Sequence, residues 1–154
     1  DVWSNTLTEP STVYFNLFDY FQAQYADGFS PFTPATHVAF AFKVALDEFF
    51  DSGGWHQRNR LFNSRAKRIA GSLLELGVKT LLPTADYSSV LYSYLLPTGV
   101  SYAALHDFLK TNGFVIYQGQ GNLSETIFRI STMGEITEEK ISLLCTLFNE
   151  FFGP

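Results

Sequence analysis

Apolar residues recur along this chain with two different spacings. A spacing of three to four residues, typical of one helix face, predicts helices over 14–26, 34–53, 55–76, 101–112 and 137–151. Short apolar or alternating runs predict strands over 78–82, 90–95, 114–117 and 126–130. This order predicts an α+β domain, in which a mostly antiparallel sheet of three to four strands is covered by helices.

The strand predicted over 126–130 contains an arginine. Side chains alternate between the two faces of a strand, so Phe128 and Ile130 share one face and Arg129 points to the other. A guanidinium among apolar residues is costly to desolvate unless an anion meets it, and its fork of donors suits a carboxylate or phosphonate. A surface arginine paired loosely with Glu125 or Glu135 is the plainer alternative, and spacing alone favours it.

Two other places offer donors to an anion. Gly119 and Gly121 could present backbone N–H groups, although a hairpin turn that needs glycine also explains them. Thr33 precedes Pro34, which suits the first turn of a helix, so Thr33 is predicted as the N-cap. A phosphate could bind the hydroxyl and amide donors there, and this is compatible with capping.

Composition and charge exclude several classes of function. The chain has 154 residues, which suits one domain, and it is 46% hydrophobic and only 16% charged, against a usual charged share of about 25%. A net charge of −5 argues against nucleic acid as a partner. No apolar run approaches the ~20 residues of a membrane span, so no membrane partner is expected.

Cysteine, histidine and the basic residues add little to this picture. A single cysteine, Cys145, is expected to be a buried, inert thiol and suits a cytoplasmic protein. The three histidines lack the spacing of metal ligands, so no metal site is predicted. The basic residues between Arg58 and Arg68 are expected to form a solvated helix face. Contact with an acidic partner domain is a less favoured use of that face.

Several segments together resemble a known family. They are Phe32–His37, Ala45-Leu46, Gly53-Gly54, Arg58 and Arg60, Gly77–Pro83, Gly113–Tyr117 with Gly119, Phe128-Arg129-Ile130, and Gly134-Glu135. In this order and spacing they resemble the C-terminal part of 2-aminoethylphosphonate–pyruvate transaminase. That enzyme is a class V aminotransferase of fold type I that uses pyridoxal 5'-phosphate (PLP). The first residues are polar and contain Pro10, which predicts an irregular arm over 1–13. The resemblance implies that 14–154 form the small C-terminal domain with its connecting helices.

The resemblance also implies what the residues do. Arg129 matches the arginine that binds the acid group of the substrate, and Thr33 matches a threonine that reaches the PLP phosphate of the neighbouring subunit. The catalytic lysine and most of the PLP site would lie in a large domain upstream, so this chain alone should be inactive. A homodimer is expected, with a small amino donor and a keto acid as partners.

The chain departs from the family's pattern near the predicted site. Gln118 and Gln120 stand where the family commonly has proline and lysine, and Ser131 stands where it has glycine. These changes leave open another class V transaminase of a small amino acid. From the residues alone, a non-catalytic α+β module that binds a small anion and a non-catalytic dimerisation domain also stay open.

Overall fold

The structure, a computed structural model, describes residues 12–153, so nearly all of the predicted arm lies outside the described residues. The chain divides into two compact units, residues 1–48 and residues 49–154. Each unit is described by itself. No helix in the described part of the chain is long and apolar enough to cross a membrane.

The first unit consists of helix α1 (Leu17–Asp27) and most of helix α2 (Thr36–Asp51). The side chain of Asn16 caps α1 by accepting hydrogen bonds from the amides of Phe18 and Asp19, and Gly28 ends the helix with a φ of 71°. Neither α1 nor α2 contains a buried residue. The helices of this unit therefore form without a hydrophobic core of their own.

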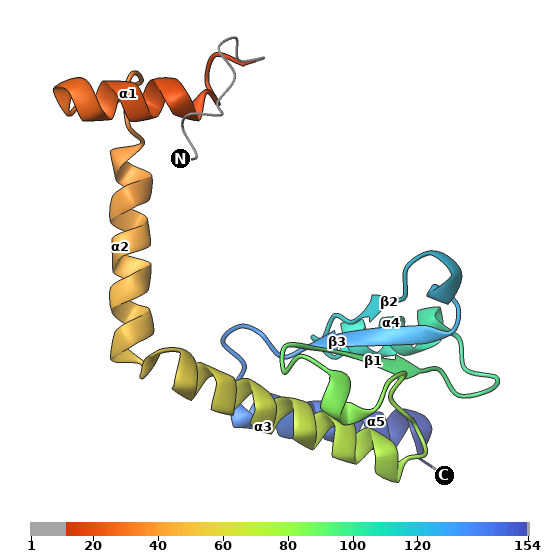
Figure 1. The fold of residues 1–154 in the computed structure, drawn as a ribbon. Helices are drawn as coiled ribbons and strands as arrows, with labels where there is room; N and C mark the ends of the chain where they lie inside the picture. Colours follow the sequence, from red (N-terminus) through yellow and green to blue (C-terminus); the bar gives the residue numbers. More distant parts are fainter. Residues whose placement is uncertain (1–11, 154) are drawn as a thin grey trace. The chain divides into compact units, whose positions relative to one another are not determined.

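The second unit is a layered α+β domain. Its elements are α3 (Gly54–Glu75), β1 (Leu91–Leu95), α4 (Tyr102–Thr111), β2 (Tyr117–Gln118), β3 (Ile127–Ser131) and α5 (Glu138–Phe152), with 3₁₀ turns at Thr84–Asp86 and Gly121–Leu123. The strands form one antiparallel sheet in the order β1-β3-β2, so β3 is central. Helices α3 and α5 run side by side below the sheet (Figure 1). The predicted fold class is confirmed.

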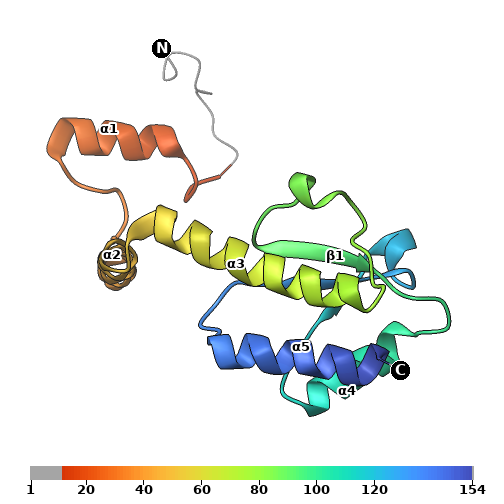
Figure 2. The same ribbon diagram turned by 90° about the horizontal axis from the view of Figure 1, so that it is seen from below.

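The core lies between the sheet and its helices. Tyr92, Tyr94, Phe128 and Ile130 form the inner face of the sheet and are at most 6% exposed. Buried residues of α3, α4 and α5 pack against this face, and Figure 2 shows these helices from below. Each large side chain that is fully buried in this way contributes about 1.5–3 kcal/mol. The same alternation that buries Phe128 and Ile130 directs Arg129 to the other face.

Two predicted strands are shorter than expected. The segment 78–82 makes only an isolated bridge between Thr80 and Tyr94, and Pro83 follows it. In the segment 114–117, the amide of Phe114 instead bonds the carbonyl of Leu109 at 2.9 Å and closes the end of α4. The first segment therefore pairs with β1 only around Thr80, where the amide of Leu81 bonds the carbonyl of Ser93 at 2.9 Å. In the second segment only Tyr117 belongs to a strand.

The predicted helix caps have mixed outcomes. Ser101 accepts a bond from the amide of Ala104, and Thr137 accepts one from Lys140, so both predicted caps are confirmed. The cap predicted at Thr33 is wrong, because α2 begins only at Thr36. The amide of Thr36 bonds the carbonyl of Pro34 at 2.8 Å, and this tight turn delays the helix.

Candidate functional site

Arg129 lies in the middle of β3, on the sheet face opposite the core. Its neighbours across the sheet are Ser93 on β1 and Tyr117 on β2. The Nε atom donates a hydrogen bond to the carbonyl of Gln118 at 2.9 Å. This bond holds the guanidinium beside Gln118, and its two terminal nitrogens donate no hydrogen bond to another group within residues 12–153. That free edge is the part of arginine that binds an oxyanion through two parallel hydrogen bonds.

Arg129 has no acidic partner among residues 12–153. The ion pairs in this part of the chain do not include it, and neither Glu125 nor Glu135 contacts it as the plainer alternative required. The residue is half-buried, and the hydrogen bond of its guanidinium to Gln118 lies at the surface, where an anion could reach the charge. The side chain is therefore available for an external anion.

Tyr102 bonds the segment that Arg129 also bonds, residues 116–118. It is on the first turn of α4 and donates a hydrogen bond to the carbonyl of Ile116 at 2.8 Å. Burial raises the pKa of this hydroxyl, whereas a hydrogen bond with the Gln118 backbone and the positive charge of Arg129 lower it. The positive charge of Arg129 therefore interacts electrostatically with the Tyr102 hydroxyl. Sequence reasoning missed Tyr102, because nothing in the helix pattern singles it out.

The two glycines of the turn after β2 have structural roles. The amide of Gly119 donates to the carbonyl of Ile127 at 3.1 Å, so it is used within the hairpin and is not free for an anion. A side chain at Gly119 would meet the backbone oxygen of Leu123 at 2.2 Å. Gly121 adopts a φ of 55°, which favours glycine. Both glycines are therefore explained by the geometry of the turn, and an anion site is not needed to explain them.

Thr33 lies in the loop before α2 and is exposed. Its hydroxyl forms none of the hydrogen bonds recorded among the described residues, so it is free to bind a ligand. Thr33 belongs to the first unit and Arg129 to the second. Each residue is therefore described in its own surroundings.

The basic face of α3 is not simply solvated, which corrects the sequence prediction. Arg65 is 6% exposed, and its Nη1 donates to the carbonyls of Thr132 and Gly134 at 3.1 and 3.0 Å. Its Nη2 donates to the carbonyl of Ile136. The guanidinium thus holds the loop between β3 and α5. The acceptors lie 67–71 residues away in sequence, so helix periodicity could not reveal them.

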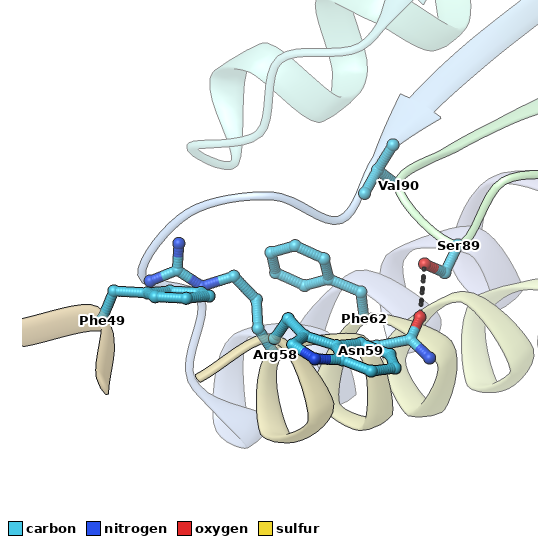
Figure 3. Close-up of a pocket in the computed structure, with 7 residues that line it drawn as sticks. Phe49, Arg58, Asn59, Phe62, Ser89 and Val90 are labelled. Carbon is cyan, nitrogen blue, oxygen red and sulfur yellow. Dashed lines mark hydrogen bonds between the residues drawn. The ribbon is translucent and has the colours of Figure 1, made fainter. Parts of the chain in front are cut away.

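A cavity of about 340 Å³ lies at the start of α3 (Figure 3). Its walls are Phe49, Trp55, Arg58, Asn59, Phe62, Ser89 and Val90. Arg58 stacks over the ring of Phe49 at 4.7 Å, and Ser89 donates a 3.4 Å hydrogen bond to Asn59. Arg129, which belongs to the same unit, does not line this cavity.

The remaining reactive side chains do not assemble into a site. No cluster of His, Cys, Asp and Glu among the described residues could hold a metal ion. Cys145 was expected to be a buried thiol; it is only partly buried, although it packs against the core. The five lysines, at positions 43, 67, 79, 110 and 140, are all exposed.

Comparison with solved structures places this fold among the aminotransferases. The aspartate aminotransferase of subgroup IV from Thermus thermophilus matches 94% of the chain with a TM-score of 0.73 and 28% identity, and the match covers 40% of that enzyme. The pyridoxamine-pyruvate aminotransferase from Mesorhizobium loti matches 96% of the chain with a TM-score of 0.71 and 20% identity, over 39% of its own length. No protein-family profile matches the chain.

Curated relatives name a more particular group. The 2-aminoethylphosphonate–pyruvate transaminase of Bacteroides fragilis is 37% identical over 120 residues, which are 77% of this chain. The enzyme of the same name from Syntrophobacter fumaroxidans is 37% identical over 73% of the chain. The chain spans about a third of the length of these relatives, 33% and 31%. The chain is therefore homologous to a portion of the 2-aminoethylphosphonate–pyruvate transaminases, which confirms the resemblance.

Proposed function

We propose that this chain is the C-terminal part, with the small domain, of a PLP-dependent transaminase that moves the amino group of 2-aminoethylphosphonate to pyruvate. The observation that carries the proposal is the free edge of Arg129, held by the Gln118 carbonyl and without an acidic partner among the described residues. The relatives' shared name supports the substrates. In this proposal Arg129 binds the acid group of the amino donor or keto acid.

None of the five lysines of this chain has the surroundings expected of the amine that reacts with PLP. An amine that forms an imine with PLP must be neutral near pH 7, and enzymes achieve this by burying it or placing it beside another cation. All five lysines here are exposed, and Lys43 is paired with Asp47 at 2.6 Å. We therefore assign the imine-forming lysine to a large domain upstream, and we expect the isolated chain to be inactive.

Thr33 fits a peripheral role at the same cofactor. Its exposed hydroxyl is free to donate a hydrogen bond to the phosphate of PLP bound by the neighbouring subunit of a homodimer. PLP, when bound, supplies the electron sink for amino transfer. The exposed apolar residues of the first unit, among them Phe40 and Phe42, suit contact with the large domain or the second subunit.

The test is Arg129→Ala in the longer enzyme. Loss of two charge-assisted hydrogen bonds, each worth about 1.5–3 kcal/mol, should lower kcat/KM for the phosphonate by at least two orders of magnitude. Arg60→Ala is a matched control, because Arg60 is exposed and, within residues 12–153, its guanidinium hydrogen-bonds to Gln57 on the same helix, so it should leave the kinetics unchanged. Unchanged kinetics for Arg129→Ala would show that Arg129 does not bind the substrate. If the unmodified longer enzyme has a higher kcat/KM with another small amino acid than with 2-aminoethylphosphonate, that amino acid is the amino donor.

A further inference from the structure

Residues 116–118, whose backbone bonds Arg129, have few hydrogen bonds to the rest of the sheet. Strand β2 has only two residues, Tyr117 and Gln118, and it lies at the edge of the sheet beside β3. A typical strand has about five to six residues, so this ladder supplies few backbone hydrogen bonds. Both residues of β2 are exposed. The position of the Gln118 carbonyl must therefore depend on other contacts as well.

Tyr102 supplies such a contact from a different element. Its hydroxyl donates to the carbonyl of Ile116 at 2.8 Å, directly before β2. The ring is anchored at the start of α4, whose N-terminus is capped by Ser101 and whose Leu105 is fully buried. Arg129 holds the same segment from the central strand through its bond to Gln118. Residues 116–118 are thus fixed by one side chain from α4 and one from β3.

We propose that Tyr102 is a positioning residue for Arg129. The Tyr102 hydroxyl bonds the Ile116 carbonyl and so restrains residues 116–118. This keeps the Gln118 carbonyl in position to accept the hydrogen bond from the Arg129 Nε. The free edge of the guanidinium then stays directed at the oxyanion of the substrate, a role that rests on the proposed function. Removal of the hydroxyl lets β2 move and lets the guanidinium rotate. This coupling between Tyr102 and Arg129 is a property of the chain itself and is measurable without substrate.

The first experiment measures hydrogen exchange of the Arg129 Nε–H by ¹⁵N NMR in this chain. Tyr102→Phe should accelerate that exchange about threefold to tenfold, the effect of losing one ordinary hydrogen bond. Tyr87→Phe is the matched control, because its hydroxyl bonds the Ser93 carbonyl on the five-residue strand β1. The control should change the exchange less than about twofold. Unchanged exchange in a folded Tyr102→Phe chain, or equal acceleration in both variants, would overturn the proposal.

The second experiment uses the longer enzyme. Tyr102→Phe should raise KM for the amino donor by the same threefold to tenfold and leave kcat within about twofold, because the substrate is oriented less well but reacts in the same way. In an Arg129→Lys background the effect should disappear, since lysine has no Nε donor to be held. An equal rise in KM in both backgrounds would refute coupling through Arg129. If exchange accelerates while Arg129→Ala leaves the kinetics unchanged, the proposed function fails and the positioning stands.

Discussion

The two units of this chain use the same kinds of residues in opposite ways. In the second unit Phe128 and Phe148 are 0% exposed and lie in a common core. In the first unit Phe40 and Phe42 are 70% and 64% exposed, and no residue of α1 or α2 is buried. Aromatic content alone therefore does not identify a core. The second unit is stabilised by its own packing, whereas the first presents an apolar surface that suits a partner.

The largest expected effect comes from matched phenylalanine substitutions in the two units. Phe128→Ala removes a fully buried ring from the core and should lower the free energy of unfolding by about 3–5 kcal/mol. Phe42→Ala removes an exposed ring and should change it by less than about 0.5 kcal/mol. Urea denaturation followed by circular dichroism measures both. A large loss for Phe42→Ala would break the comparison, because it would show that α2 is packed within this chain.

A smaller effect is expected from the arginines of α3. Arg65→Met removes the donors for three loop carbonyls and should cost about 2–4 kcal/mol, less than the sum of its bonds because an unpaired buried charge is also removed. Arg68→Met removes an exposed ion pair with Glu138 and an exposed hydrogen bond to the Ser142 hydroxyl, and should cost about 1 kcal/mol or less. Thermal unfolding compares the variants. Equal losses would mean that the loop after β3 does not depend on the buried guanidinium.

The smallest effect concerns acid pH. Hydrogen bonds from its own amide and from the Thr137 side chain lower the pKa of Glu139 at the start of α5. A lowered folded-state pKa stabilises the fold above the unfolded value of about 4.3, and this contribution is lost as pH falls through the folded-state pKa. Glu139→Gln should therefore slightly flatten the decline of stability with acidification. Denaturant midpoints measured between pH 7 and pH 3 report it. A steeper decline in the variant would contradict the assignment.

Local patterns predicted the helices and the orientation of Arg129 well. Glycine at Gly28 and hydroxyls at Ser101 and Thr137 are local signals for helix ends, and alternation along β3 follows from strand geometry. The contacts of Arg65 and Tyr102 could not be predicted. Both side chains bond backbone carbonyls on other elements, and a carbonyl is present at every residue, so no sequence signal marks the acceptor.

The plainest predictive failures share one cause. Residues 78–82 and 114–117 have strand-like composition, yet one makes a single bridge and the other ends a helix. Thr33 has the right side chain for a cap, but its helix begins three residues later. At Phe114 and Thr36 competing backbone hydrogen bonds decide the outcome, and at 78–82 the pairing with β1 extends over only one bridge before Pro83. In all three places propensity is the weaker influence.

The long sequence separation of the Arg65 contacts has a kinetic consequence. Contacts between residues 67–71 positions apart require a large loop to close, so they tend to form after the local helices during folding. An interaction that is absent from the transition state slows unfolding and has little influence on the folding rate. The buried guanidinium should therefore lengthen the lifetime of the native state, and with it resistance to proteases that act on the opened chain.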